Sequence, residues 1–480
     1  FPKEKEAYEY AHITFYQFDR HQIQRNSNKI NDIKSGISMN GLMADVSSVP
    51  MGETYRSGFG SKHMPVKRTD LTNLACNYNA VVNVVASGEN FERNKAICST
   101  IDFKVKDQLE NLYTNSQWVT YIDPKVDLDF FKEKDDLVII HYSDQYNNSS
   151  GYDAITVSDK TAQYANIVGE FLAKNNVQHN DKKDTLEVIN FFNAINGDWL
   201  LKLIRQDSQF PREKISLLSG IKSSLTFLHH PNIVWVPVSL EEILRISGSA
   251  GLKMSDGLFS AKNLHSKEFS FSDDLLMIGI ERCEGKVQMH LYPMELKIGG
   301  SNLVSKGLEQ GKRTADLLRK HLTMGGFLGE FYRNFFAKLA ITNAEKMKLY
   351  KIWGNQHWEY IYKDYRSDLL NNNFKVSTAL DDAYGTFGLI HFGNGTIQRK
   401  LKRENDYVLA ELLEEDGYNY LVKSIDELID LFHNTETGIE KSNLLVQKIP
   451  NGTCIVPPSI TKPIEKIEVD EPVASIKDVQ

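Results

Sequence analysis

The stretch DDLLMIGIERCEGKVQMHLYPMELKIGG, residues 273–300, decides the fold of this protein. Two runs rich in aliphatic residues flank the dipeptide Glu284-Gly285, and a short polar segment with glycine between apolar runs favours a tight turn. The stretch therefore predicts an antiparallel hairpin, with a first strand from Leu275 to Arg282 and a second from Val287 to Ile298.

The position of the turn predicts which residues face each other across the hairpin. If the turn is centred between residues 284 and 285, Asp274 pairs with Glu295, because both lie equally far from that centre. Their Cβ atoms would then be about 5 Å apart on one face. Lys297 shares this face, because side chains two residues apart in a strand point the same way. A slip of one residue would put Asp273 in place of Asp274.

Paired carboxylates next to a lysine indicate a metal-dependent hydrolase. Two neighbouring carboxylates are costly to bury unless a cation compensates them, and Mg²⁺ (or Mn²⁺) prefers such oxygen ligands. A metal ion held by Asp274 and Glu295 would acidify a water for attack on a phosphodiester, and Lys297 would stabilise the transition state. The alternative is a solvated hairpin end that carries only a salt bridge.

The hairpin and the basic helix expected after it resemble the core of PD-(D/E)XK nucleases. In that superfamily an acid begins one strand, E-x-K lies on the next, and a helix with a polar residue facing DNA follows. The resemblance implies that Asp274, Glu295 and Lys297 are catalytic, that Gln310 in LVSKGLEQGK is the helical polar residue, and that the fold is α/β, with a mixed sheet flanked by helices. The proline of the family name is absent, because a serine and an aspartate precede Asp274.

An acid on the preceding helix sometimes completes the metal site in this superfamily. Glu241 and Glu242 in SLEEILRISG, residues 239–248, are the candidates, and the resemblance does not choose between them. Ser239 and Glu242 also form a capping-box pattern, so the alternative role of Glu242 is to cap the start of a helix.

Four segments are expected along the chain. Residues 1–184 predict an N-terminal α/β domain, and residues 185–350 predict a helix-rich nuclease-like domain that contains the hairpin. Residues 351–436 mix short strand signals with a final helix and predict a small C-terminal α+β element. Residues 437–480, which end in a tail that alternates proline with charges, predict a linker or disordered segment.

Charge and composition restrict the class of protein. The chain of 480 residues is 41% hydrophobic and 25% charged, as in ordinary globular proteins, and its net charge of −7 disfavours nucleic-acid binding by the whole surface. Local basic clusters remain, at QRKLKR (398–403) and on the helix after the hairpin. Lys306, Lys312 and Arg313 on that helix are the candidate DNA contacts, and the alternative for both clusters is a solvated face.

Compartment and cofactor use follow from what the sequence lacks. No run of 18 apolar residues is present, so we expect no membrane span. The four cysteines lie far apart and predict free thiols in a reducing cytoplasm. The first residues, FPKEKEAYEY, include no initiator Met and predict a fragment or processed product. GLEQGKRT departs from the phosphate-loop spacing, so we expect no ATP hydrolysis by this chain itself.

A wider run resembles the H subunit of phosphorothioation-dependent DNA restriction systems. The similar phrases are WVTYIDPKVDLDFF, VIIHYSDQY, VPVSLEEILRISGSAGL and SDDLLMIGIE, in a span of roughly residues 120–320. The resemblance implies bacterial defence that cleaves DNA lacking the host's sulfur modification, with partner subunits and a HerA/FtsK-like ATPase motor. A catalytically inactive DNA-binding module of a translocase and a DNA repair nuclease are the alternatives. Oligomeric state, modification sensing and single- or double-strand cleavage are left open.

Overall fold

The computed structural model of the protein describes three quarters of its C-terminal half and separate parts of its N-terminal half. The described residues are 11–16, 21–22, 46–51, 54–59, 81, 84–85, 98–102, 105–122, 137–143, 153–160, 162–178, 183–196, 199, 210–240 and 275–449.

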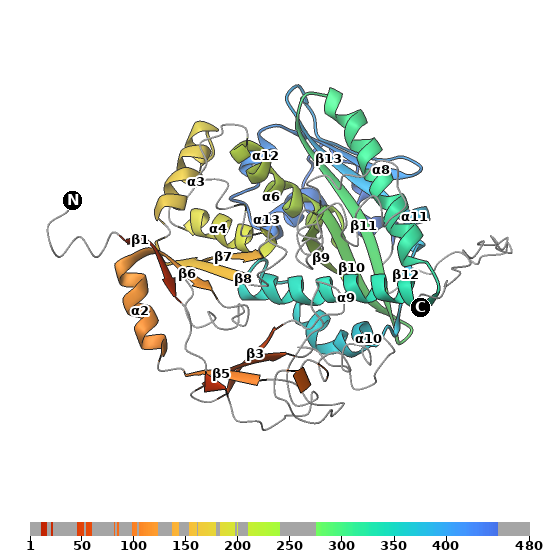
Figure 1. The fold of residues 1–480 in the computed structure, drawn as a ribbon. Helices are drawn as coiled ribbons and strands as arrows, with labels where there is room; N and C mark the ends of the chain where they lie inside the picture. Colours follow the sequence, from red (N-terminus) through yellow and green to blue (C-terminus); the bar gives the residue numbers. More distant parts are fainter. Residues whose placement is uncertain are drawn as a thin grey trace, which may run out of the picture.

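A seven-stranded mixed sheet forms the centre of the molecule (Figure 1). Its strands are β9 (Val234–Ser239), β10 (Leu275–Cys283), β11 (Lys286–Gly299), β12 (Phe374–Ser377), β13 (Phe387–Gly393), β14 (Lys400–Arg403) and β15 (Tyr407–Leu413). The spatial order is β14-β15-β13-β11-β10-β9, with β12 paired to β11 as well. The mixed α/β class expected from the sequence is confirmed.

The hairpin that decides the fold forms in the expected register. β10 and β11 pair antiparallel, from Leu275 opposite Met294 to Cys283 opposite Lys286. Glu284 and Gly285 make the turn with φ angles of 49° and 77°. Positive φ at both central residues gives the turn a twist that matches the strands, and glycine adopts it without steric cost. The register is therefore confirmed for the described pairs.

The C-terminal strands do not form a separate element, which corrects the expectation for residues 351–436. β13 pairs parallel with β11 over Met294–Gly299, and β12 pairs parallel with the first half of β11. β15 then pairs parallel with β13, and β14 closes the edge antiparallel to β15. The physical reason is that the outer edge of the long strand β11 leaves backbone N–H and C=O groups that require partners.

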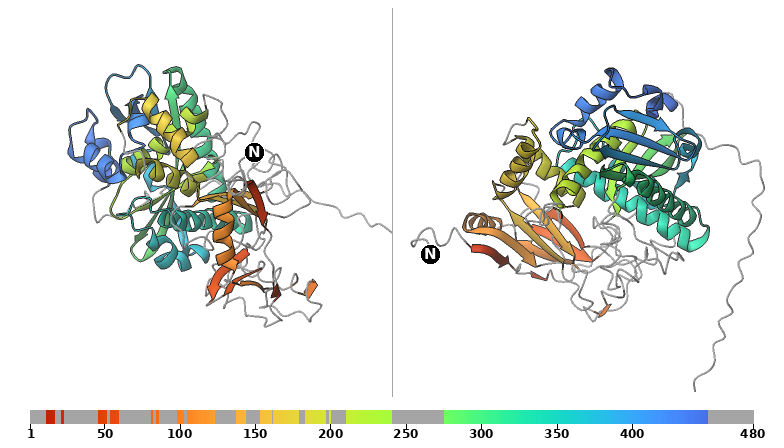
Figure 2. Two further views of the ribbon diagram at one scale, coloured as in Figure 1. Left: turned by 90° about the vertical axis from the view of Figure 1, so that its left-hand side faces the viewer. Right: turned by 90° about the horizontal axis from the view of Figure 1, so that it is seen from above.

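Helices cover both faces of this sheet. On one face α6 (Phe210–Phe227) approaches so closely that a Cβ at Gly220 would lie 2.7 Å from the Leu296 side chain. On the other face lies α8 (Asn302–Leu322), the long helix expected from residue 302, followed by α9 (Gly326–Leu349). Figure 2 shows α8 and α9 on the side of the sheet opposite the C-terminal helices. The result is a three-layer arrangement.

Shorter elements complete the C-terminal half. They are η4 (Tyr360–Asp364), α10 (Arg366–Leu370), α11 (Ala379–Tyr384), α12 (Asp416–Asn419), α13 (Ile425–Ile429), η5 (Asp430–Asn434), η6 (Lys441–Asn443) and α14 (Leu445–Lys448). Leu444 and Leu445 are buried in the common core. Residues 437–449 are thus folded, contrary to the expected linker, because they bring apolar side chains to that core.

The N-terminal half contributes two smaller sheets. One has the order β1-β6-β8-β7 and the other β2-β5-β4-β3. Their strands are β1 (Ala11–Tyr16), β2 (His21–Gln22), β3 (Val46–Met51), β4 (Thr54–Phe59), β5 (Cys98–Asp102), β6 (Ser116–Ile122), β7 (Val138–Ser143) and β8 (Asp153–Ser158). The helices are α2 (Val105–Asn115), α3 (Ala162–Lys174) and α4 (Lys183–Asn196).

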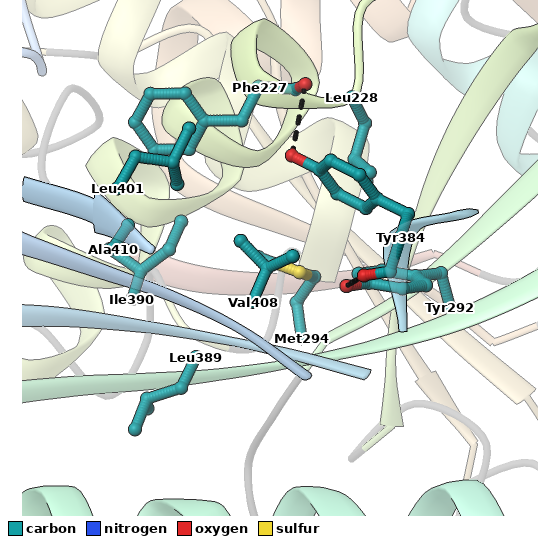
Figure 3. A pocket seen from close by; sticks show the side chains of 10 residues that line it. All are labelled: Phe227, Leu228, Tyr292, Met294, Tyr384, Leu389, Ile390, Leu401, Val408 and Ala410. Atoms are coloured by element: carbon teal, nitrogen blue, oxygen red, sulfur yellow. Dashed lines mark hydrogen bonds between the residues drawn. The ribbon is translucent and has the colours of Figure 1, made fainter. Parts of the chain in front are cut away.

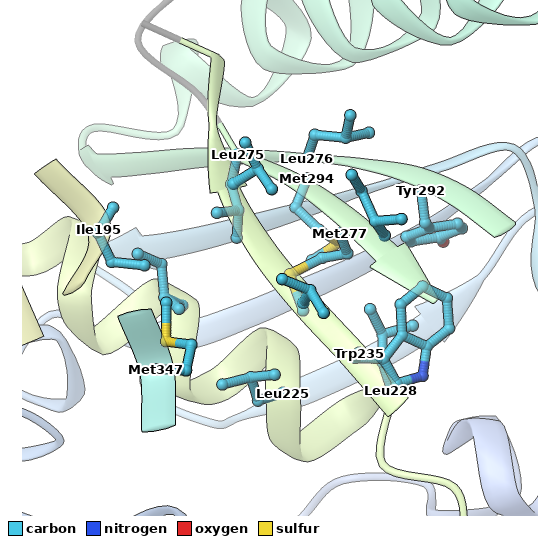
Figure 4. Close-up of a cluster of buried hydrophobic side chains, with 14 of the residues drawn as sticks. Ile195, Leu225, Leu228, Trp235, Leu275, Leu276, Met277, Tyr292, Met294 and Met347 are labelled. Carbon is cyan, nitrogen blue, oxygen red and sulfur yellow. The ribbon is translucent and has the colours of Figure 1, made fainter. Parts of the chain in front are cut away.

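One hydrophobic core joins part of the N-terminal half to the central sheet. It runs from Val138 in β7 through α4 and α6 to Ile449. Figure 4 shows its centre, where Leu225 of α6, Met347 of α9 and Met277 of β10 lie together. This continuity binds β7, α3 and α4 of the N-terminal half to the central sheet through burial of apolar surface.

The expectation of four free thiols is wrong at Cys283, which is disulfide-bonded at the end of β10. Spacing along the chain could not reveal this, because a disulfide requires only that two cysteines lie close together in space. Among the described helices, none has the length and apolarity needed to cross a membrane.

Two glycines give a first test of the close helix–sheet contact. A Cβ at Gly311 of α8 would lie 2.5 Å from the buried ring of Phe387, whereas Gly169 of α3 has nothing within 4 Å. We expect Gly311→Ala to lower the free energy of unfolding, because overpacking costs about 1–3 kcal/mol and helix propensity returns only ~1 kcal/mol. Gly169→Ala is the matched control and should raise it. Urea titrations measure both, and a stabilised Gly311→Ala variant would contradict the described packing.

Three histidines near the end of α6 predict loss of stability in mild acid. Burial lowers the pKa of His229 to about 4 and also lowers the pKa values of His230 and His433. The unfolded chain binds protons near pH 6.5 but the folded chain does not, so the free energy of unfolding should fall as pH drops from 6.5 towards 4. Burial raises the pKa of Asp381 to about 6, so this one carboxyl group should raise the free energy of unfolding as the pH drops. It offsets only part of the effect of the three histidines. Urea midpoints at pH 7.5 and 5 test this, and equal midpoints would refute it.

Candidate functional site

The structure describes part of the predicted catalytic set. Glu295 and Lys297 lie on β11, and Gln310 lies on α8. Asp274 and its alternative Asp273 fall outside the described residues, as do Glu241 and Glu242. The last described pair of the hairpin is Leu275 opposite Met294.

Glu295 is held inside the molecule by the sheet and by α8. On β11 it pairs in register with Leu389 of the parallel strand β13. A Cβ at Gly307 of α8 would lie 3.4 Å from the Glu295 side chain and 2.9 Å from Leu389, so the glycine lets the helix lie directly over the carboxylate. Glu295 is consequently only 2% exposed. A carboxylate at such a position requires a positive partner.

Lys297 supplies that positive charge. Its ammonium group donates a hydrogen bond to Oε1 of Glu295, and its side chain is 17% exposed. The two residues share one face of β11, as the spacing of two predicted. The lysine is thus positioned between the buried carboxylate and solvent, where a positive charge can act on an incoming anion.

α8 places a polar side chain next to this region. Gln310 lies on the half-buried flank of the helix, one helical turn after Gly307. Its Oε1 is buried and accepts no hydrogen bond from any described residue. A buried amide oxygen without a donor is uncommon and indicates a partner such as water, an ion or a ligand. The catalytic role that the resemblance assigned to Gln310 stays a prediction.

His391 of β13 is a neighbour that sequence reasoning missed. It pairs in register with Lys297, is 2% exposed, and its Nε2 lies 3.0 Å from the carbonyl oxygen of Gly299. Its Nδ1 is buried and has no hydrogen-bond partner in the described part of the chain. The only signal was one polar residue within the apolar run FGLIHFG. Its nearness to Lys297 depends on a parallel pairing that no local pattern predicts.

The predicted DNA contacts lie on the outer side of α8. Lys306, Lys312 and Arg313 are all exposed. Arg313 pairs with Glu309 at 2.8 Å one helical turn away, and Lys312 lies 3.9 Å from a carboxylate oxygen of Asp406. These surface pairs contribute little and leave the cations accessible to a polyanion.

No group of three or more His, Cys, Asp or Glu side chains that could hold a metal ion occurs among the described residues. Asp274 and Glu242, the other predicted ligands, lie outside the described residues. Glu295 is the described carboxylate of the set.

A small cavity lies inside the protein, and Leu389, the register partner of Glu295, is one of its lining residues. Apolar side chains from α6, β11, β13, β14 and β15 line it, together with the rings of Tyr292 and Tyr384 (Figure 3). Both hydroxyls donate to backbone carbonyls, Tyr292 to Phe387 at 2.8 Å and Tyr384 to Phe227 at 3.4 Å. Burial raises the pKa of each tyrosine far above its usual value, so neither ionises readily. The cavity is a feature of the core packing.

Comparison of the chain with protein-family models, with curated proteins and with solved structures finds no match.

Proposed function

We propose that this protein is a magnesium-dependent DNA endonuclease that hydrolyses phosphodiester bonds at Glu295 and Lys297. The observation that carries the proposal is a buried carboxylate paired with a lysine two residues further along one strand face. The hairpin register supports it, because in the sequence Asp274 directly precedes Leu275 and Glu295 directly follows Met294.

The donor chemistry fits a hard divalent cation. Carboxylate oxygens are the ligands that Mg²⁺ and Mn²⁺ prefer, and Glu295 is a carboxylate shielded from bulk water. Asp274 and Glu295 would hold the ion, with Glu242 as a weaker candidate, and the bound metal would supply an acidified water. Lys297 would bind the phosphate and stabilise negative charge that develops on it. Gln310, whose buried amide oxygen has no donor among the described residues, would orient the water or the phosphate.

The order of elements supports the PD-(D/E)XK resemblance in outline. β10 begins one residue after Asp274, β11 carries E-x-K, and α8 with Gln310 follows directly. β13 then lies parallel to β11, so the carboxyl ends of both strands meet at one edge of the sheet. Ligands commonly bind at this edge in open α/β sheets.

The wider biological role is a separate part of the proposal. It rests on the sequence phrases shared with phosphorothioation-dependent restriction proteins. On that basis we infer a cytoplasmic defence complex that cleaves unmodified foreign DNA, with other subunits and a HerA/FtsK-like ATPase as partners.

One observation favours a second candidate, a nuclease-fold DNA-binding module without catalysis. In the structure Lys297 already neutralises Glu295, so this carboxylate is compensated without a metal ion. Salt-dependent DNA binding without cleavage in Mg²⁺ or Mn²⁺ would support this candidate.

The test is cleavage of plasmid DNA in Mg²⁺, in Mn²⁺ and in EDTA. We expect nicked or linear product only with metal, and none from the Asp274→Ala and Glu295→Ala variants. Glu309→Ala, which removes an exposed carboxylate on α8, is the matched control and should cleave normally. Unchanged cleavage by both site variants would overturn the assignment.

A further inference from the structure

Two rows of side chains cross the sheet on its α8 face, from the candidate site to the edge strand β14. Residues paired in register on neighbouring strands point to the same face. The first row consists of Glu295, Leu389, Leu409 and Lys402. The second consists of Lys297, His391, Glu411 and Lys400. Each row thus begins at a proposed catalytic residue and ends at a lysine.

The outer part of this face is accessible. Along β15 the burial alternates, with Val408, Ala410 and Leu412 buried on the α6 side and Leu409 and Glu411 half-buried on the α8 side. Lys400 and Lys402 on β14 are exposed. α8 covers β11 and β13, where Gly307 and Gly311 contact the sheet, and the side chains beyond them stay in contact with solvent.

The distance between the two ends matches a bound duplex. Strands lie about 4.8 Å apart, so three steps from β11 to β14 span about 14 Å. Each strand of B-DNA carries a phosphate every ~3.4 Å of helix axis. The lysines are therefore within reach of the same duplex, a few nucleotides from a phosphate bound at Lys297.

The segment that leads into β14 is firmly anchored. The backbone N–H of Asn394, directly after β13, donates to the carbonyl oxygen of Gly299, the last residue of β11, at 3.0 Å. Arg399 makes two hydrogen bonds to Asp416, at 2.8 and 2.6 Å. Between these anchors Ile397 is 96% exposed, where an aliphatic side chain can lie against sugars or bases of a bound duplex. A preformed segment loses little conformational entropy on binding.

One acidic side chain lies among these groups. Glu411 is 3.7 Å from the Lys402 ammonium group, and it is also the register partner of Lys400. An exposed pair of this kind is weak, and a phosphate can replace the carboxylate as the partner of the lysine.

We propose that Lys400 and Lys402 bind the phosphate backbone of the DNA duplex that the candidate site cleaves. The proposal rests on the nuclease function, because only the position of Lys297 defines where the duplex enters. It adds the edge strand β14 to the outer face of α8 as a DNA-binding surface.

The test is duplex binding measured by fluorescence anisotropy in EDTA at several salt concentrations, so that no cleavage is required. The variant is Lys400→Gln/Lys402→Gln, and the control is Lys363→Gln/Lys375→Gln, which removes two exposed lysines elsewhere. We expect only the Lys400→Gln/Lys402→Gln variant to bind more weakly. The slope of the logarithm of its binding constant against the logarithm of the salt concentration should be smaller in magnitude by about two. An unchanged slope would overturn the proposal.

The outcomes separate this proposal from the nuclease function. If the wild-type protein cleaves plasmid in Mg²⁺ and the Lys400→Gln/Lys402→Gln variant binds and cleaves equally well, the surface is wrong and the function stands. If no form cleaves but binding depends on these lysines, the surface stands and the catalytic function is wrong. Absence of any duplex binding by the wild-type protein would overturn both.

Discussion

Replacing Lys297 by methionine is expected to abolish most DNA cleavage while leaving the protein able to bind Mg²⁺. The proposed role of the ammonium group is to stabilise charge on the phosphate, and removal of one such group typically costs on the order of 100-fold or more in rate. The same ammonium group neutralises Glu295 in the structure. Without the ammonium group the carboxylate loses this positive charge and should bind a metal ion more tightly.

The stability of this variant should depend on the metal ion. Glu295 is 2% exposed, and removing one partner of a buried ion pair destabilises by about 3–5 kcal/mol. We expect a lower melting temperature in EDTA and a larger increase on adding Mg²⁺ than the wild-type protein shows, because the ion then supplies the missing positive charge.

Differential scanning fluorimetry and plasmid cleavage give the two readouts. Lys286→Met, which removes an exposed lysine at the opposite end of β11, is the control and should change neither melting nor metal response. Lys297→Arg keeps the charge and should retain stability, because the ion pair with Glu295 persists. If Lys297→Met cleaves at the wild-type rate, the lysine has no catalytic role. If Mg²⁺ stabilises it no more than the wild-type protein, Glu295 is no metal ligand.

Replacing Asp416 by alanine is expected to destabilise the protein by about 3 kcal/mol or more, the lower end of the range for a broken buried ion pair. Asp416 is 2% exposed and accepts hydrogen bonds from Nε and Nη2 of Arg399 and from the backbone N–H of Leu413 at 3.0 Å. Its removal leaves the Arg399 charge unpaired. That guanidinium is 26% exposed, and partial hydration therefore places the loss at the lower end.

Urea titration with linear extrapolation measures this loss. Glu309→Ala breaks the exposed Arg313 pair and should cost less than about 0.5 kcal/mol. The double variant Arg399→Met/Asp416→Leu should recover much of the lost stability, since apolar replacement of a whole buried pair is often neutral. A loss at Asp416→Ala no larger than that at Glu309→Ala would show that this ion pair does not stabilise the fold.

Part of the candidate site could be predicted from the sequence, and part became visible only in the structure. The spacing of two residues predicted that Glu295 and Lys297 share one face of a strand, because the two-residue period of a strand is a local property. His391 and Lys400 were not predicted to lie in one row with Lys297, because their alignment depends on parallel and edge pairings over about a hundred residues. Such pairings have no turn between the strands to fix their register.

Domain boundaries were the least predictable feature. Composition separated residues 351–436 from the hairpin, yet their strands complete its sheet. The disulfide at Cys283 was likewise hidden, since closeness in space leaves no mark on spacing along the chain.

The sequence by itself determined the hairpin, its turn at Glu284-Gly285 and the long helix that follows, because each depends on neighbouring residues alone. The tertiary structure alone decided that β13 and β15 extend β11, that α8 lies directly over Glu295, and that lysines of β14 end the rows that begin there. The physical reason is that these contacts satisfy unpaired strand edges and bury apolar faces contributed by distant segments, and no local pattern states which segments will meet.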